Sequence, residues 1–191
     1  IGQPYQKTPN FIKGIIENSF NKWHLYPPVG GIPELRKEYL GWLKRRFNIA
    51  KNIPDESILP LAGSKEGLFS IALALAYTDI IVPNPFYQAY LAPSMVSKVN
   101  ICYLNINKKN DYLFDLEKLD QQLKKKKSLV YFCSPSNPHG KNASYSYIKK
   151  LIGIIRKNDA TLLVDECYVD IYTKNKPVGA LKVCLDSDKN L

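Results

Sequence analysis

The stretch Thr161-Leu-Leu-Val-Asp-Glu-Cys-Tyr168 decides the fold. Its apolar start has no internal break and predicts a fully buried β-strand over residues 161–165. A carboxylate at the end of such a strand is costly unless a cation or a strong donor meets it. Because ligands of open α/β sheets bind at the carboxyl ends of the strands, Asp165 is a candidate ligand anchor. Tyr168 can project its phenol towards the same ligand.

A second buried-strand pattern, Ser128-Leu-Val-Tyr-Phe-Cys133, runs into the loop Ser134-Pro-Ser-Asn-Pro-His-Gly140. Two prolines and a glycine make this loop rigid, and Pro138 favours an extended backbone at Asn137. The Asn137 amide therefore offers donors and an acceptor from a fixed position. The spacing from Asn137 to Asp165 is about one strand–helix–strand unit, so we expect both at the same edge of the sheet.

Short strands and amphipathic helices alternate along the chain from residue 58 onwards. This alternation predicts an α/β fold with a mostly parallel sheet and helices on both faces. An earlier helix is expected to begin at Pro33 with a single apolar stripe that is core or interface. We expect strands over 58–61, 80–82, 101–104, 128–133 and 161–165, and helices over 11–20, 64–76, 87–96, 114–123 and 145–157.

Composition and charge narrow the functional classes. The 191 residues are 45% hydrophobic, enough for one sizeable core or for one domain and the start of another. The formal net charge of +10 permits a nucleic-acid partner, but no basic-aromatic interleaving or nucleic-acid motif accompanies it. We interpret the charge as lysine-rich composition, with the run 124–127 a solvated helix end. We therefore expect no nucleic-acid partner.

No apolar stretch is long enough for a membrane span, and the start shows no signal-peptide pattern. We therefore expect a cytoplasmic protein without a membrane partner. The four cysteines and two histidines lack metal-type or redox-type spacing, which predicts mostly buried, reduced thiols and no metal site. The chain opens on Ile1-Gly2 without an initiator methionine, which suggests a piece of a longer protein.

Two further loops follow expected strands. Ala62-Gly-Ser-Lys-Glu-Gly67 lies at a strand-to-helix turn, where free backbone amides and the Ser64 hydroxyl either bind a phosphate or simply cap the helix. Pro83-Asn-Pro-Phe-Tyr87 presents aromatics that either plug the sheet edge or stack on a planar ring. The four loops thus offer an anion-binding turn, an aromatic side chain, an amide and a carboxylate. Together they suit a ligand with a planar, phosphorylated, cationic ring, and pyridoxal 5'-phosphate fits that description.

With these motifs the chain resembles the class I/II aminotransferases, which are fold-type-I enzymes dependent on pyridoxal phosphate. The Ile-Gly-x-Pro start and Asp-Glu-Cys-Tyr look most similar to the succinyldiaminopimelate aminotransferase branch of lysine biosynthesis, and relatives with aspartate or other amino-acid substrates are alternatives. His139 departs from the threonine that is common in relatives. The matching segments occur in family order: 1–4, Tyr26-Pro-Pro-Val-Gly-Gly-Ile-Pro-Glu-Leu-Arg36, 62–67, 84–87, 136–140 and 165–168.

The resemblance implies a role in cofactor binding for residues of all four loops. Ser64 and the Lys65 amide would hold the phosphate, and Tyr87 would stack on the pyridine ring. The remaining contacts would be to the ring substituents: Asn137 and Tyr168 to the hydroxyl oxygen, and Asp165 to the protonated ring nitrogen.

The resemblance also implies an N-terminal segment, residues 1–32, on the substrate side and at a dimer interface. There Gly2 would face the substrate carboxylate, and Tyr26 would reach the phosphate in the other subunit of a homodimer. Residues 33–191 would be a partial large domain, incomplete at its C-terminus, with the C-terminal small domain absent.

The Schiff-base lysine of the family is expected beyond Leu191, so no catalytic residue is assigned within the chain. Lys189 lacks the Ser-x-Ser-Lys context, and Lys174 and Lys176 look like exposed turn residues. The resemblance implies a transaminase that moves an amino group between an amino acid and a 2-oxo acid. We expect the 191 residues alone to be inactive. The alternative is a non-catalytic remnant or binding module that retains the fold.

Overall fold

The structure is a computed structural model that describes residues 5–124 and 126–187. The chain divides into two units, of which the first comprises Ile1–Leu40 and Pro54–Pro60. The second comprises Gly41–Ile53 and Leu61–Leu191. Helix α2 (Pro33–Phe47) begins in the first unit and ends in the second.

The first unit contains α1 (Asn10–Ser19), two 3-10 turns, η1 (Phe20–Lys22) and η2 (Asp55–Ser57), and the start of α2. The Gly30-Gly31 turn before α2 is held by Arg36, which donates to the Gly30 carbonyl over 3.1 Å. Arg36 also pairs with Asp55 at 3.6 Å. A Cβ on Gly31 would lie 2.5 Å from Pro60, so this turn has room only for glycine.

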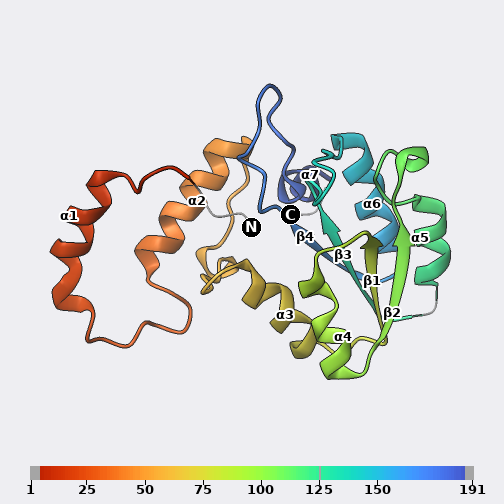
Figure 1. The fold of residues 1–191 in the computed structure, drawn as a ribbon, viewed down its shortest axis with the longest axis horizontal. Helices are drawn as coiled ribbons and strands as arrows, with labels where there is room; N and C mark the ends of the chain where they lie inside the picture. Colours follow the sequence, from red (N-terminus) through yellow and green to blue (C-terminus); the bar gives the residue numbers. More distant parts are fainter. Residues whose placement is uncertain (1–4, 125, 188–191) are drawn as a thin grey trace. The chain divides into compact units, whose positions relative to one another are not determined.

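The second unit is built on a four-stranded parallel sheet in the order β2-β1-β3-β4, which confirms the predicted α/β fold (Figure 1). Parallel pairing needs a crossover between successive strands, and helices or turns supply it here. The register places Cys133 opposite Asp165. The strands are β1 (Asp79–Asn84), β2 (Asn100–Asn105), β3 (Ser128–Cys133) and β4 (Thr161–Asp165).

Helices pack against both faces of this sheet, as the sequence predicts (Figure 1). Each face of the sheet has its own hydrophobic core, and alternate residues of β1 point to opposite faces. Ile80 and Val82 pack on the side of α3 (Ser64–Ala74), and Ile81 packs on the other side. That other core is formed mainly with α5 (Leu116–Leu123), α6 (Tyr145–Lys157) and α7 (Ala180–Ser187).

Several boundaries differ from the sequence predictions. Residues 58–61 form no strand, because Leu59 and Leu61 are exposed and Pro60 lacks a donor for a ladder. The expected helix over 87–96 is broken into the turn η3 (Gln88–Tyr90) and α4 (Ala92–Ser97). Helix α7 is an addition that the sequence pattern did not predict.

Three further expectations need correction. Residues 161–164 of β4 are half-buried rather than fully buried, because in the described part of the chain β4 pairs with β3 alone. Lys126 is not simply a solvated helix end, because its ammonium pairs with the buried Asp79 at 3.0 Å. All four cysteines are free, but the expectation that they are mostly buried is wrong: Cys133 is buried, Cys102 and Cys184 are half-buried, and Cys167 is exposed.

Among the described residues, none of the helices has the length and apolar character of a membrane span. Over the same residues, no group of histidine, cysteine and carboxylate side chains is arranged to hold a metal ion.

Candidate functional site

The candidate site lies at the carboxyl edge of the sheet in the second unit, where the loops after β3 and β4 run side by side. The strand pairing continues one step into the β3 loop, because the Ser134 N–H donates to the Asp165 carbonyl over 3.1 Å. This pairing brings the loops of Asn137 and Tyr168 together, as parallel topology predicts.

Asp165 is a buried carboxylate, with 8% of its surface exposed. The Tyr90 hydroxyl donates to its Oδ2 over 2.7 Å, and the Cys167 N–H donates to its Oδ1 over 3.1 Å. No lysine or arginine of the described chain forms an ion pair with it. The partners of the buried carboxylate are therefore neutral donors, which leaves its negative charge available for a cationic ligand.

Tyr90 is the main site residue that sequence reasoning missed. Burial chiefly raises the pKa of its phenol, and the nearby Cys133 and Asp165 raise it further. The hydroxyl therefore keeps its proton and remains a donor to Asp165. The sequence indicated its role only weakly. Tyr90 lies three residues after the predicted Tyr87, but no sequence pattern connects it with Asp165.

Asn137 and Tyr168 are in direct contact. The Asn137 Nδ2 donates to the Tyr168 hydroxyl over 3.2 Å, which joins the two strand-end loops. Desolvation is the largest cause of a raised pKa of the Tyr168 phenol, followed by Cys133, Cys167 and Asp165. The phenol thus keeps its proton and can donate to an acceptor in the site.

Tyr87 is half-buried and packs edge-on against Tyr90, with ring centroids 5.9 Å apart and an interplanar angle of 88°. The Lys65 Nζ lies 6.0 Å from the centroid of the Tyr87 ring. The two predicted residues from different loops therefore lie near each other, and Tyr87 is connected to Asp165 through Tyr90.

The start of α3 carries Ser64 and Lys65, both exposed. Gly63 has a φ of 132° and no side chain caps the helix, so the first backbone amides are available to an anion. The Ser64 Oγ lies 3.3 Å from the Cys167 Sγ, which links this turn to the loop after β4. Six predicted residues, Ser64, Lys65, Tyr87, Asn137, Asp165 and Tyr168, thus lie in one connected region.

A cavity of about 650 Å³ opens beside this region. Its lining includes Ser136, Asn137, Asn142, Tyr168 and Tyr172. Small-molecule sites usually have volumes of roughly 300–1,000 Å³, so the cavity is large enough for a small ligand.

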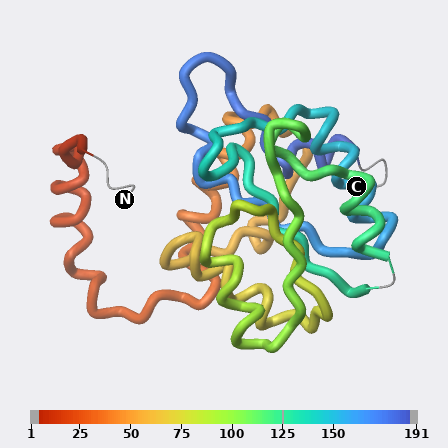
Figure 2. Tube along the Cα trace, turned by 45° about the vertical axis from the view of Figure 1, so that its right-hand side comes forward, coloured from red at the N-terminus to blue at the C-terminus, as the bar shows by residue number. Residues whose placement is uncertain are grey.

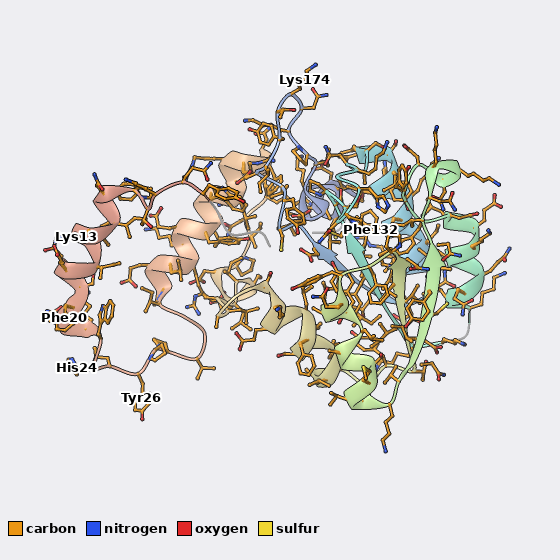
Figure 3. The ribbon with its side chains drawn as sticks, viewed as in Figure 1. Lys13, Phe20, His24, Tyr26, Phe132 and Lys174 are labelled. Atoms are coloured by element: carbon orange, nitrogen blue, oxygen red, sulfur yellow. The ribbon has the colours of Figure 1, made fainter. Side chains whose placement is uncertain are left out.

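Two predicted site residues remain, Tyr26 and Gly2. Tyr26 belongs to the first unit, where its side chain is 98% exposed, and Gly2 lies outside the described residues. Lys189 also lies outside them. Lys174 and Lys176 are exposed, as predicted. They belong to the long loop between β4 and α7, drawn in blue in Figure 2, with Lys174 at its tip in Figure 3.

Arg46, at the end of α2, anchors the chain directly after Tyr168. Its guanidinium donates to the Val169 carbonyl over 2.6 Å and forms an ion pair with Asp170. It also lies over the ring of Phe47, 4.7 Å from the centroid. These partly buried contacts restrict the loop that carries Tyr168, and the sequence pattern did not indicate them.

Glu166 anchors the far end of the same loop. Its Oε1 accepts a 2.6 Å hydrogen bond from the Ala180 N–H at the start of α7. Burial is the largest cause of its raised pKa, which the Ala180 bond and Arg46 partly oppose. Glu166 therefore faces inward to the protein rather than to a ligand at the site.

His139, the departure from the common family pattern, stacks on Tyr112 with ring centroids 4.4 Å apart. It thus packs against the segment between β2 and α5. Nearby, burial raises the pKa of the Cys133 thiol to about 11, so this cysteine is protonated and unreactive at neutral pH.

The chain is similar to known proteins in both sequence and fold. The family model described as "Aminotransferase class I and II" matches residues 1–190. An LL-diaminopimelate aminotransferase of Dehalococcoides mccartyi strain BAV1 is 34% identical over 95% of this chain and 48% of its own length. The chain therefore spans about half the length of the curated relatives it matches.

Solved structures show the same fold. The aminotransferase AspB from Helicobacter pylori aligns with a TM-score of 0.86 and 31% identity over 98% of this chain and 50% of its own. An aminotransferase from Neisseria meningitidis aligns with a TM-score of 0.88 and 31% identity, over 97% and 48% of the two chains. Aspartate aminotransferase from Thermus thermophilus, at 20% identity, shares the fold with a TM-score of 0.86 over 96% and 48%.

Proposed function

Because the chain belongs to the class I and II aminotransferase family, we propose that its natural protein is a transaminase dependent on pyridoxal phosphate. It would transfer an amino group between an amino acid and a 2-oxo acid. The observation that carries this proposal is Asp165, a buried carboxylate at the end of β4 whose partners are neutral donors.

The described residues fit the cofactor of the family. Asp165 has a negative charge for a protonated ring nitrogen, and such a charge-assisted bond is worth roughly 1.5–3 kcal/mol. The uncapped start of α3 provides backbone amides and the Ser64 hydroxyl for a phosphate. Tyr87, near Lys65, offers an aromatic ring for stacking. These features match the charge and the shape of pyridoxal phosphate.

When bound, the cofactor supplies an electron sink for the carbanion that forms at the substrate carbon. Asp165 would keep the ring nitrogen protonated. Asn137 and Tyr168, already in contact over 3.2 Å, would hold the ring hydroxyl oxygen between the loops. The contribution of these residues would be orientation and charge rather than covalent chemistry.

Three parts of the proposal concern the natural protein as a whole. The Schiff-base lysine is proposed to lie beyond Leu191. Tyr26 is proposed to reach the cofactor phosphate of the second subunit in a homodimer, and Gly2 to face the substrate carboxylate. Under this proposal residues 1–32 serve the substrate side and the dimer interface, and 33–191 form part of the large cofactor-binding domain.

The substrate is proposed to be diaminopimelate or its N-succinyl derivative, which would place the protein in lysine biosynthesis in the cytoplasm. The relatives named LL-diaminopimelate aminotransferase support this choice. The structural likeness to aspartate aminotransferase supports the fold alone. Aspartate is therefore included in the assay only as an alternative amino donor.

The test is a titration of the protein, expressed at its natural length, with pyridoxal phosphate, followed by an assay with a panel of amino acids and 2-oxo acids. Asp165→Asn should weaken cofactor affinity by at least about tenfold. Asp120→Asn, an equal charge change on α5 where Asp120 binds Lys157, is the control. If the protein binds pyridoxal phosphate but does not transaminate, the alternative of a non-catalytic binding module is favoured. If it does not bind pyridoxal phosphate, the proposal is refuted.

A further inference from the structure

Tyr90 is among the most deeply buried side chains of the described chain, with 1% of its surface exposed. Its ring stacks on Tyr131 with centroids 4.7 Å apart and an interplanar angle of 17°. Tyr87, three residues earlier in the chain, meets it edge-on. With its ring held by two neighbours, the Tyr90 hydroxyl has a fixed position from which it donates to Asp165 over 2.7 Å.

We propose that Tyr90 is a positioning residue that orients the Asp165 carboxylate for the cofactor ring nitrogen. This inference rests on the proposed function. Tyr90 would act through Asp165 and would not itself touch the ring nitrogen.

The orientation follows from the two donors of Asp165. The Cys167 N–H holds Oδ1 and the Tyr90 hydroxyl holds Oδ2, so neither oxygen can rotate without the loss of a bond. A carboxylate has about four acceptor sites, so acceptor capacity remains for a third donor.

A simpler role for Tyr90 is that of a core residue whose hydroxyl merely needs an acceptor. Tyr131 shows what that role looks like, because its buried hydroxyl donates to the backbone carbonyl of Leu68. The two tyrosines are stacked neighbours that differ in their acceptor. Tyr131→Phe is therefore a matched control for Tyr90→Phe: each removes one buried hydroxyl, and only the latter releases Asp165.

The experiment compares two ligands of the protein at its natural length, freed of cofactor. One is pyridoxal phosphate, and the other is its analogue with carbon in place of the ring nitrogen. Dissociation constants are measured by absorbance titration for the wild type, Tyr90→Phe and Tyr131→Phe. The melting temperature of each unliganded protein is measured in parallel to record the structural effect of each change.

The wild type should prefer pyridoxal phosphate over the carbon analogue, and Tyr90→Phe should reduce this preference about five- to tenfold. Tyr131→Phe should lower the melting temperature and leave the preference unchanged. Equal losses for both ligands in Tyr90→Phe, or no loss, would overturn the inference. A wild type without any preference would instead contradict the proposed role of Asp165.

If Tyr90→Phe does not fold, two analogues of tyrosine at position 90 repeat the comparison without a large change in volume. 4-Aminophenylalanine retains a donor and should retain the preference, whereas 4-methylphenylalanine lacks one and should lose it. Equal preference with both analogues would count against Tyr90 as a positioning residue.

Discussion

The Asn137 amide donates to the Tyr168 hydroxyl over 3.2 Å and so joins the loops that follow β3 and β4. Both residues occupy strand ends whose register is set by the pairing of Cys133 with Asp165. The contact is therefore a consequence of the parallel sheet, and it presents an amide and a phenol to the same space.

Tyr168→Phe should weaken the affinity for pyridoxal phosphate roughly three- to tenfold, because one polar contact to the ring oxygen is lost. The free energy of unfolding should change little, since 37% of the Tyr168 side chain is exposed. Absorbance titration measures the affinity. Tyr145→Phe is the control: it removes a comparably exposed hydroxyl whose partner is Asp186, and it should bind like the wild type. An unchanged affinity in Tyr168→Phe would remove this residue from the site.

Ser64→Ala should weaken binding of pyridoxal phosphate roughly three- to tenfold and leave binding of pyridoxal, which has no phosphate, nearly unchanged. The reason is that the Ser64 hydroxyl lies at the uncapped start of α3, where an anion is favoured. Ser70→Ala, an exposed position in the same helix, provides the comparison. A similar loss for both ligands would indicate that Ser64 supports the loop rather than the phosphate.

Arg46→Lys should lower the free energy of unfolding by about 2 kcal/mol, because a lysine cannot reproduce the bonds to both Val169 and Asp170. Chemical denaturation of the unliganded protein measures this loss. The exposed Arg45→Lys should be neutral within about 0.5 kcal/mol. Equal stability of the two variants would show that the Arg46 contacts do not hold the loop.

Glu166→Gln should change how stability depends on pH. The folded-state pKa of Glu166 is raised above its ordinary value of 4.5, so its protonated form favours folding. That stabilisation is complete below about pH 4.5 and is lost as the pH rises through the folded-state pKa. Glutamine retains the acceptor for the Ala180 N–H and does not ionise.

The melting temperature of Glu166→Gln relative to that of the wild type should therefore increase as the pH rises above 4.5. Thermal scans across pH 4 to 8 follow this difference. Glu38→Gln, at an exposed position of α2, should show no such trend. A constant difference between Glu166→Gln and the wild type would contradict a raised pKa of Glu166.

Local patterns predicted β3, β4 and α6 with the bounds that the structure has. The reason is that an unbroken apolar run or a single apolar stripe depends only on neighbouring residues. Residues 58–61 show the limit of this approach, because four residues with a proline carry too little periodicity. The same limit applies to α7, a short helix whose first N–H is bound by the distant Glu166.

The site was predictable as far as chain topology allows. Parallel strands bring their carboxyl ends to one edge, so Asn137, Asp165 and Tyr168 could be grouped from their positions alone. Tyr90 and Arg46 could not be found in this way. Their bonds join residues that are 75 and 123 positions apart in the chain, and no local rule connects them.

Local sequence therefore predicted the alternation of strands and helices, the loops that carry the candidate site, and a carboxylate in need of a partner. Folding determined which donors meet that carboxylate and which arginine holds the loop beside it. The physical reason is that periodicity and turn chemistry depend on adjacent residues, whereas a hydrogen bond depends on atoms within about 3 Å, wherever the chain has brought them.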